Sequence, residues 1–249
     1  MRQFGLIGFP LSHSFSKGYF ANFFLKEKIL DAHYENYPIE SIDLFLDIWK
    51  SNPSLKGLNV TIPYKKLVIP FLQHSSSVVQ SIQACNCIKL HEGALYGYNT
   101  DVIGFEQSLL PYLQTHHQKA LIFGTGGAAA AVECVLQKLG IAYQLVSRTA
   151  SEGCITYASL TPDVIAAHTL LINTSPLGMF PMVEEAPNLP YEAITSKHHL
   201  YDLVYNPAVT KFLEKGAAQG ATTQNGLEML HLQADASWEI WNSETPFIQ

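Results

Sequence analysis

Residues 119–129, KALIFGTGGAA, decide the fold. Their first half is an apolar run bounded by glycine, which is typical of a strand buried on both faces of a parallel sheet. The glycines lead into an apolar segment over 128–139, which stops at Gly140, a residue that favours the left-handed conformation at a helix C-cap. This stretch therefore predicts a strand, a glycine-rich turn and a helix in direct succession.

The glycine-rich turn, residues 124–129, follows the pattern GxGxxA. In a strand–turn–helix unit such glycines let the backbone approach a pyrophosphate, and the helix N-terminus faces the anion. Glycine-rich turns without a ligand are also common, so the motif alone is a weak signal. The strand before it and the helix and strand after it favour dinucleotide binding.

The residues after the next predicted strand bear on which dinucleotide is bound. Folds that prefer NAD place an acidic residue about 20 positions beyond the first glycine, where it holds the ribose 2′-hydroxyl. Here the segment is Ser147-Arg148-Thr149, and a cation suits a 2′-phosphate. We therefore expect NADP, although a solvated surface arginine would give the same pattern.

Outward from this unit, strand-like and helix-like segments alternate along the chain, which predicts an α/β fold with parallel strands and right-handed crossovers. Strands are expected at 4–8, 58–62, 85–90, 95–98, 120–123, 141–146, 169–172 and 200–204. Helices are expected near 20–28, 42–49, 128–139 and 227–241. We expect two lobes with a cleft between them and a hinge near 99–104. The substrate domain would take residues 1–101 and the C-terminal helix 226–249, and the Rossmann-type NADP-binding domain would take residues 102–225.

The composition excludes several classes of protein. The chain has 249 residues with 47% hydrophobic and 14% charged residues, which argues against disorder. Its net charge of −6 makes a nucleic-acid partner unexpected. No run approaches the roughly 20 apolar residues of a membrane helix, and the four cysteines do not form a disulfide framework. The expected compartment is the cytoplasm, with no membrane partner.

Two polar clusters in the first half of the chain are candidates for a small-molecule site. Ser14 and Ser16 would place two hydroxyls on one side of an extended segment, where they could hold a carboxylate. They could equally cap the helix that follows, and the sequence alone favours capping. Cys85-Asn86-Cys87 has no second Cys or His pair at metal-ligand spacing, so we expect no metal.

The second cluster pairs a lysine with a carboxylate. Asn59 and Thr61 share one face of a predicted strand, and Lys65 follows just beyond a proline. Asp101 comes after another strand. A lysine near a carboxylate can move a proton to or from a carbonyl oxygen. A surface lysine and a turn aspartate remain the ordinary alternative.

Taken in order, these motifs resemble those of the shikimate dehydrogenase family over nearly the whole chain. The segments that carry the resemblance are 8–16 (GFPLSHSFS), 59–65 (NVTIPYK), Asn86, 99–101 (NTD), 124–128 (GTGGA), 147–149 (SRT), 173–179 (NTSPLGM), 205–207 (YNP) and 225–230 (NGLEML). Ordered agreement of this kind is far more specific than any single motif.

The resemblance implies roles for the substrate residues. Lys65 would donate and accept the proton at the C3 oxygen of the substrate, with Asp101 hydrogen-bonded beside it. Ser14, Ser16 and Tyr205 would hold the ring carboxylate. The residues implied to bind the ring hydroxyls or to position the lysine are Asn59, Thr61, Asn86 and Gln233.

The resemblance also implies a set of cofactor residues. These are Gly124, Gly126, Gly127, Ala128, Ser147, Arg148, Thr149, Thr174, Leu203 and Gly226. The glycine-loop members would cradle the pyrophosphate, Arg148 and Thr149 would meet the 2′-phosphate, and the last three would approach the ribose–nicotinamide end.

Three positions depart from the family pattern. Lys17 stands where the family usually has proline, which would add a cation near the carboxylate site. Ser147 replaces the usual asparagine. Residues 150–153 supply Glu152 but not the second arginine that commonly follows. These differences bear on substrate affinity and on how strictly NADP is preferred over NAD.

The activity implied by the resemblance is the NADPH-dependent, reversible reduction of 3-dehydroshikimate to shikimate, within the shikimate pathway toward chorismate and the aromatic amino acids. Such proteins act without a metal and occur as monomers or homodimers. One alternative is an NAD-dependent quinate/shikimate dehydrogenase. Another is a non-catalytic sensor that binds the same ligand, against which the presence of Lys65 and Asp101 argues.

Overall fold

The protein is described from a computed structural model, which covers residues 1–12 and 14–246. The chain divides into two compact units. Unit 1 comprises Met1–Thr100 and Ala234–Gln249, and unit 2 comprises Asp101–Gln233. Residue 13, within the serine-containing segment, lies outside the described residues. Within the described ranges, no helix is long and apolar enough to cross a membrane.

Unit 1 is built on a mixed six-stranded sheet with the strand order β2-β1-β3-β5-β6-β4. Its strands are β1 (Arg2–Gly8), β2 (Ala32–Pro38), β3 (Leu55–Val60), β4 (His74–Ser75), β5 (Cys87–His91) and β6 (Ala94–Tyr98). Strands β1, β2 and β3 run parallel, whereas β5 is antiparallel to both β3 and β6. The β5–β6 hairpin turns at Glu92 and Gly93, which both adopt positive φ. The parallel arrangement implied by alternating strands and helices thus holds for β1, β2 and β3, whereas the strands expected at 85–90 and 95–98 form an antiparallel hairpin.

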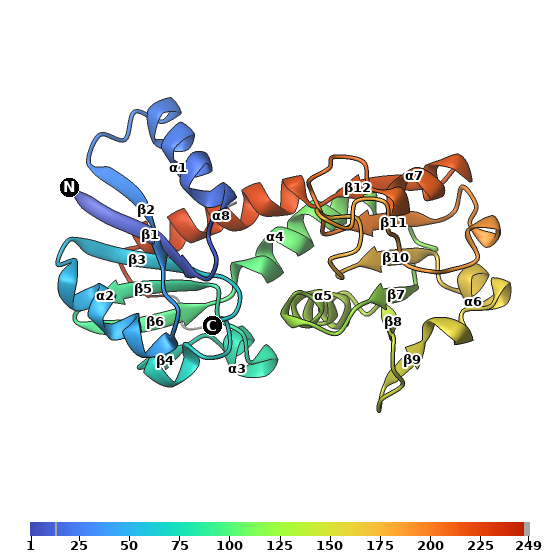
Figure 1. The fold of residues 1–249 in the computed structure, drawn as a ribbon, viewed down its shortest axis with the longest axis horizontal. Coiled ribbons are helices and arrows are strands. Elements are labelled where there is room, and N and C mark those ends of the chain that lie inside the picture. The colour runs from blue at the N-terminus through green and yellow to red at the C-terminus, as the bar shows by residue number, and fades with distance from the viewer. Residues whose placement is uncertain (13, 247–249) are drawn as a thin grey trace. The chain divides into compact units, whose positions relative to one another are not determined.

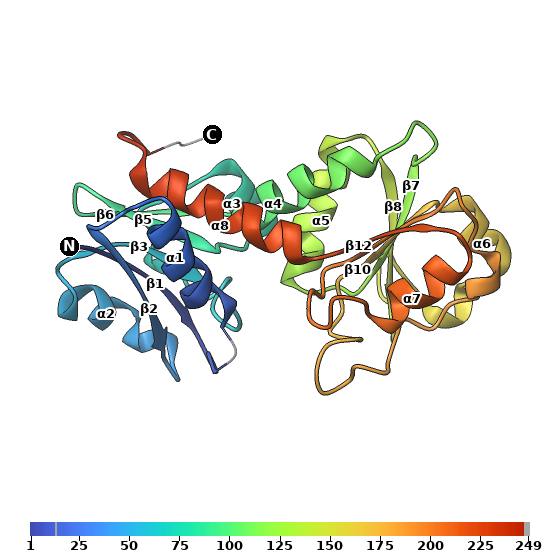
Figure 2. The same ribbon diagram turned by 90° about the horizontal axis from the view of Figure 1, so that it is seen from above.

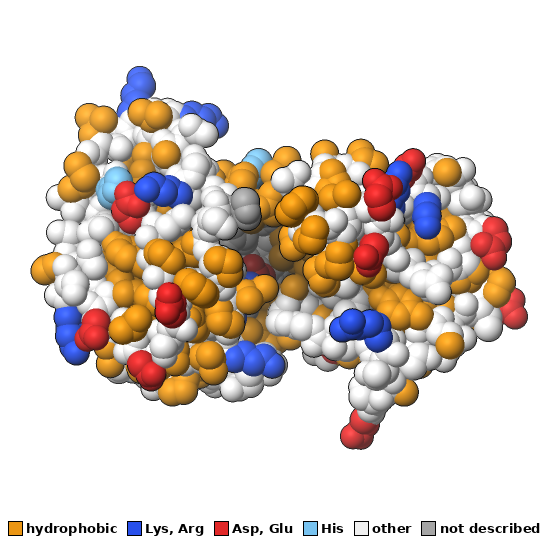
Figure 3. Space-filling view, in the orientation of Figure 1, with side chains coloured by type: hydrophobic (Ala, Val, Ile, Leu, Met, Phe, Trp, Pro, Cys, Tyr) orange, Lys and Arg blue, Asp and Glu red, His pale blue; other side chains and the backbone are white. Residues whose placement is uncertain are grey.

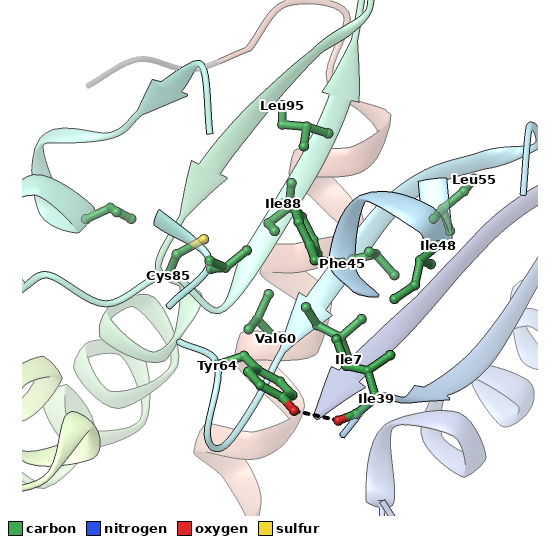
Figure 4. Close-up of a cluster of buried hydrophobic side chains, with 13 residues drawn as sticks. Ile7, Ile39, Phe45, Ile48, Leu55, Val60, Tyr64, Cys85, Ile88 and Leu95 are labelled. Atoms are coloured by element: carbon green, nitrogen blue, oxygen red, sulfur yellow. Dashed lines mark hydrogen bonds between the residues drawn. The ribbon is translucent and has the colours of Figure 1, made fainter. Parts of the chain in front are cut away.

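Helices cover both faces of this sheet, as Figure 1 shows. They are α1 (Phe15–Lys26), α2 (Phe45–Ser51), α3 (Ser77–Ile82) and α8 (Leu227–Asn242), of which the last is shared with unit 2. On one face Phe45 of α2 and Val79 of α3 pack with Ile7 and Ile88 of the sheet (Figure 4). On the other face, α1 and α8 bury an aromatic cluster in which Trp241 stacks on Phe4 at 4.8 Å.

Unit 2 is a six-stranded parallel sheet with the order β12-β11-β10-β7-β8-β9. Its strands are β7 (Lys119–Phe123), β8 (Ala142–Ser147), β9 (Cys154–Thr156), β10 (Leu170–Asn173), β11 (His199–Asp202) and β12 (Thr222–Asn225). The order reverses between β7 and β10, which is the doubly wound arrangement of dinucleotide-binding folds. The predicted α/β fold with a Rossmann-type domain is therefore confirmed.

The helices of unit 2 lie on both faces of its sheet (Figure 2). They are α4 (Thr100–Leu109), whose first residue belongs to unit 1, α5 (Gly127–Lys138), α6 (Pro162–Ala167) and α7 (Lys211–Ala218). On one face, Ile165 of α6 and Phe212 of α7 pack with Leu121 and Leu200 of the strands. On the other, Phe105 of α4 packs edge-on against Tyr201 at 5.1 Å.

Several element boundaries differ from the expected ones. The strand expected at 58–62 ends at Val60, because the chain turns before Pro63. Strand β2 has the polar sequence AHYENYP and gives no apolar signal. The segment expected to act as a hinge, 99–104, lies mostly within α4. The C-terminal boundary between the two units lies within α8, between Gln233 and Ala234, and not before the helix as expected. The first turns of α8 belong to unit 2 because Gly104 of α4 packs against their backbone.

Candidate functional site

The loop between β1 and α1 leaves one buried hydroxyl without a partner. Ser14 is the N-cap residue of α1, yet its side chain makes no capping hydrogen bond. Its Oγ is buried and has no hydrogen-bond partner among the residues the structure describes. Capping, which the sequence alone favours, is therefore wrong for this hydroxyl. A buried polar atom of this kind calls for a partner, and a ligand oxygen would supply one.

Ser16 is tied into the core of unit 1 through Tyr34 of β2. Its hydroxyl hydrogen-bonds to the hydroxyl of Tyr34. Burial raises the pKa of Tyr34 well above its ordinary value, so the phenol keeps its proton. The Tyr34 hydroxyl donates to Oδ1 of Asn59 at 2.9 Å. A continuous polar path thus runs from the start of α1 to strand β3.

Asn59 uses both of its amide hydrogens inside unit 1. Nδ2 donates to Oγ of Ser237 on α8 at 2.8 Å and to the carbonyl oxygen of Asn86 at 3.3 Å. An asparagine amide has two N–H donors, so none is left for a ligand. The arrangement favours Asn59 as a residue that positions its neighbours.

Asn86 holds the beginning of α4. Its Oδ1 accepts from the backbone N–H of Thr100 at 2.6 Å, and its Nδ2 donates to Thr100 Oγ1 at 3.0 Å. One amide hydrogen of Asn86 therefore stays available to a ligand. Asp101, which follows Thr100 in the chain, lies in the first turn of α4.

Lys65 lies in a turn that Tyr64 anchors. The Tyr64 side chain is buried among Ile7 and Val60, and its hydroxyl donates to the carbonyl oxygen of Ile39 at 2.5 Å (Figure 4). The carbonyl oxygen of Lys65 accepts from the N–H of Cys85 at 2.8 Å. The backbones of Lys65 and Thr100 are thus both held by the pair 85–86.

Two further residues of unit 1 have defined surroundings. The amide N–H of Thr61 donates to the carbonyl oxygen of Ile7 at 2.9 Å, and the Thr61 methyl group faces Gly8. The Lys17 ammonium pairs with the Glu35 carboxylate at 2.6 Å. The cation that replaces the family proline is therefore largely neutralised by a neighbour on β2.

In unit 2 the glycine loop has the form a phosphate site requires. Gly124 has φ +122°, and a Cβ there would lie 2.6 Å from Oγ1 of Thr174, so the position demands glycine. A Cβ at Gly126 or Gly127 would meet nothing within 4 Å. The start of α5 is therefore open above these two glycines, and its first turn holds no acidic residue. These features fit the pyrophosphate of a dinucleotide.

The segment after β8 presents a single cation. The Ser147 hydroxyl donates to the carbonyl oxygen of Thr149, so it closes its own turn. Arg148 is exposed and forms no hydrogen bond or ion pair with the described residues. In the face shown by Figure 3, side chains of both charges are scattered singly or in small groups. A free guanidinium beyond the second strand suits a 2′-phosphate.

The remaining predicted cofactor residues lie at the carboxyl ends of neighbouring strands. Thr174 follows β10 and donates through Oγ1 to the carbonyl oxygen of Phe123 at 3.0 Å. Leu203 follows β11, and a Cβ on Gly226 would lie 2.1 Å from its carbonyl oxygen. Ligands of open α/β sheets bind at this edge of the sheet, near the reversal of strand order.

Tyr205 and Gln233, predicted substrate residues, both belong to unit 2. Burial raises the pKa of Tyr205, which lies in the loop after β11. Gln233 lies on α8, where Nε2 donates to the carbonyl oxygen of Leu230 at 2.9 Å. In the described part of the chain, no group of three or more His, Cys, Asp or Glu residues is placed to hold a metal ion.

Comparisons with known proteins agree with the motifs. Residues 6–88 match the family model described as the shikimate dehydrogenase substrate binding domain. A shikimate dehydrogenase (NADP(+)) of Methanosphaera stadtmanae is 33% identical, and the match covers 97% of this chain and 92% of the relative. The chain belongs to the shikimate dehydrogenase family. The resemblance stated from the sequence is thereby confirmed.

Solved shikimate dehydrogenases have the same fold. The enzyme of Thermus thermophilus, in complex with NADP(H) and shikimate, is 29% identical and superposes with a TM-score of 0.86, covering 99% of this chain and 95% of that one. The enzyme of Listeria monocytogenes, in complex with shikimate and NAD, is 25% identical with a TM-score of 0.86, covering 100% and 94%. Relatives of the family are thus known with either dinucleotide.

The structure adds residues to which the sequence assigns no role in the site. Tyr34 and Ser237 connect the predicted substrate residues of unit 1, and Asp202 and Asn173 connect the loops of unit 2. Tyr34 lies in a polar strand and looks like an ordinary strand residue. Asp202 carries a weak signal, because a carboxylate that directly follows the apolar residues of a buried strand needs hydrogen-bond donors around it.

Proposed function

We propose that this protein catalyses the reversible reduction of 3-dehydroshikimate to shikimate with NADPH, as a small-molecule enzyme of the cytoplasm that works as a monomer or homodimer. The observation that carries the proposal is the match to NADP-dependent shikimate dehydrogenases over 97% of the chain, which spans both units. The unpartnered Ser14 hydroxyl, the open glycine loop and the free Arg148 agree with it.

In this proposal the residues of unit 1 bind the ring and move the proton. Ser14 and Ser16, with Tyr205 of unit 2, hold the carboxylate, and Asn86 offers its remaining N–H to a ring hydroxyl. Thr61 and Gln233 contribute to the ring contacts, and Asn59 fixes the scaffold. During shikimate oxidation Lys65 takes the proton of the C3 hydroxyl.

Asp101 accepts a hydrogen bond from the resulting ammonium and stabilises it. In the direction of reduction, the Lys65 ammonium returns a proton to the oxygen at C3 as the C–H bond forms. When bound, NADPH would supply the hydride for reduction and NADP+ would accept it in the reverse direction. The cofactor would be bound by the glycine loop at its pyrophosphate, by Arg148 and Thr149 at its 2′-phosphate, and by Thr174, Leu203 and Gly226 at its nicotinamide end.

The test is the reduction of NADP with shikimate, followed by absorbance, for the wild type and for Lys65→Ala. Removal of a proton-transfer group should lower kcat about 1,000-fold and leave the affinity for shikimate within a few-fold. Lys66→Ala, which removes the exposed lysine next in the chain, is the matched control and should keep normal turnover. Near-normal kcat in Lys65→Ala would contradict the assigned role.

The second candidate function is an NAD-dependent quinate/shikimate dehydrogenase. The absence of an arginine from residues 150–153 favours it, as does the relative solved with NAD. The same assay with NAD in place of NADP, and with quinate in place of shikimate, separates the two functions by the ratio of kcat/KM values. A wild type that reduces neither dinucleotide with shikimate or quinate would support a non-catalytic binding protein.

A further inference from the structure

Asp202, at the end of β11, is a fully buried carboxylate surrounded by neutral donors. Its Oδ1 accepts from Nδ2 of Asn173 at 2.9 Å and from the backbone N–H of Val204 at 3.0 Å. Its Oδ2 accepts from Oγ1 of Thr210 at 2.5 Å. These donors belong to the end of β10, the loop after β11 and the N-cap of α7. One carboxylate therefore joins three segments of unit 2.

The hydrogen bond to Asn173 connects Asp202 with the segment that packs against the glycine loop. Asn173 Nδ2 also reaches the carbonyl oxygen of Leu177 at 3.2 Å, and its Oδ1 accepts from the N–H of Ser175 at 3.0 Å. Thr174, between these contacts, lies where a Cβ on Gly124 would collide with it. The conformation of Asn173 thus fixes the position of the Thr174 side chain against the loop.

The hydrogen bond from Val204 connects Asp202 with the residue that follows β12. The N–H of Leu203 donates to the carbonyl oxygen of Asn173 at 2.9 Å, and the N–H of Gly226 donates to that of Val204 at 3.2 Å. Gly226 packs so closely on Leu203 that no Cβ fits between them. The loop bonded to Asp202 is therefore also the loop that carries Leu203 and supports Gly226.

We propose that Asp202 is a positioning residue for the nicotinamide end of the cofactor: through Asn173 and Val204 it holds Thr174, Leu203 and Gly226 in one fixed arrangement. The inference rests on the proposed function. Hydride transfer depends on bringing donor and acceptor carbons to within about 3.5 Å, and a displacement of about 1 Å can lower the rate about 100-fold. Such precision needs rigid support behind the residues that touch the ring.

A carboxylate is an unusual choice for a purely structural role at this place. Burying a charge without a cation is costly, and no Lys or Arg of the described residues forms an ion pair with Asp202. Burial, with the negative charge of Asp202, raises the pKa of Tyr191, and the Lys215 ammonium lies over the Tyr191 ring at 4.8 Å. Bonds from N–H and O–H groups to a carboxylate are shorter and stronger than neutral ones, which suits a rigid support.

The experiment compares Asp202→Ala with Thr210→Val, which removes the bond from Asp202 toward α7, together with the N-cap bond from Leu213, and leaves the bonds to Asn173 and Val204 intact. Binding of NADP and of 2′-phospho-ADP-ribose, which has no nicotinamide ring, is measured by calorimetry, and kcat is measured with shikimate at about pH 8. Asp202→Ala should lower kcat about tenfold or more and weaken NADP binding about fivefold, while the affinity for 2′-phospho-ADP-ribose changes less than about twofold. Thr210→Val should leave all three within about twofold.

Asp202→Asn serves as the rescue variant. Its Oδ1 can still accept from Asn173 and Val204, and its Nδ2 can donate to Thr210, so most of kcat should return. If Asp202→Ala does not fold, Asn173→Ala removes the same Asn173–Asp202 hydrogen bond and should have the same effects on kcat and on the two affinities. Equal loss of affinity for NADP and for the ring-free analogue, or equal effects of Asp202→Ala and Thr210→Val, would overturn the inference. A wild type inactive toward shikimate would overturn the proposed function instead.

Discussion

Strand β11 has four residues and carries a buried titratable side chain at each end, His199 at the amino end and Asp202 at the carboxyl end. His199 hydrogen-bonds through Nδ1 to Oγ1 of Thr222 at 2.9 Å, and Tyr112 stacks on its ring at 5.0 Å. Asp202 instead gathers donors from the loops that carry the predicted cofactor residues. The same strand thus ends in a packed aromatic cluster on one side and, on the other, in a hydrogen-bonded network that joins the segments carrying the predicted cofactor residues.

The two ends differ because of the topology of the sheet. In a parallel sheet all carboxyl ends meet at one edge, and the reversal of strand order between β7 and β10 leaves space there for a ligand. The amino ends meet at the opposite edge, where the ring of the buried His117 lies 6.2 Å from that of His199. His199 is held at that edge by its bond to Thr222 and has no assigned role in the site.

The largest expected effect comes from filling the closest backbone contact at the carboxyl edge. A Cβ in Gly226→Ala would lie 2.1 Å from the carbonyl oxygen of Leu203, so β12 must move away from β11. We expect a loss of about 3 kcal/mol or more in the stability of unit 2. Amide hydrogen exchange of β11 measures this loss, because the three tryptophans, Trp49, Trp238 and Trp241, all belong to unit 1.

The matched variant for that prediction is Gly126→Ala. Its Cβ meets nothing within 4 Å, and its φ of −84° suits alanine. Exchange rates in β11 should therefore stay normal, while NADP binding weakens because the methyl group lies where the pyrophosphate would approach. Equal protection of β11 in the two glycine variants would contradict the packing argument.

The second expected effect is that the two ends of β11 make the stability of unit 2 depend on pH with opposite signs. Burial raises the pKa of Asp202 from its ordinary 3.8 to about 6, despite the opposing hydrogen bonds from Thr210, Val204 and Asn173. The folded state therefore keeps a proton that the unfolded state loses, and stability falls as pH rises from about 4 to about 6. Burial, with His117 nearby, lowers the pKa of His199 from 6.5 to about 4. Its contribution is present above pH 6.5 and is lost as pH falls toward 4.

Each of these pKa shifts corresponds to about 3 kcal/mol of folding free energy. The two contributions to the pH dependence of stability therefore offset each other in the wild type. In Asp202→Asn, the stability of unit 2 relative to the wild type should rise by about 2 kcal/mol from pH 4 to pH 6. In His199→Asn, which can keep the bond to Thr222, the relative stability should rise by a similar amount as pH falls from about 6.5 to 4. Hydrogen exchange of β11 at each pH measures both, and parallel profiles for the two variants would refute the assignment.

The sequence predicts the two ends of β11 unequally well. The apolar run over 200–204 and the glycine pattern before α5 locate the strand, the fold and the cofactor loop, because periodicity and turn residues are local signals. The family resemblance supplies Thr174, Leu203 and Gly226. Neither signal reveals that Asp202 joins the segments that carry them, since that fact depends on a donor at the end of β10, 29 residues away in the chain, and on a hydroxyl at the N-cap of α7.

The same limit applies in unit 1. The sequence identifies Ser16 and Asn59 as candidates but not Tyr34, the hydroxyl that connects them. Strand β2, which carries Tyr34, is polar and gives no alternation to detect. Long-range hydrogen bonds of this kind become visible only when the strands are paired. The expected capping by Ser14 fails for a related reason, because the orientation of a single hydroxyl is set by the packing around it.

The smallest expected effect tests whether the amino end is independent of the site. Thr222→Val keeps the shape of the side chain and removes the hydroxyl that bonds to Nδ1 of His199 at 2.9 Å and to the carbonyl oxygen of His198 at 3.4 Å. The loss of these bonds should cost about 1 kcal/mol in the stability of unit 2. NADP affinity by calorimetry and kcat with shikimate should both stay within about twofold of the wild type, since the change lies at the edge of the sheet opposite the glycine loop. A change in either quantity comparable to that of Asp202→Ala would show that the two ends of β11 are coupled, and rigidity of the whole strand would then replace the carboxyl-end scaffold as the explanation.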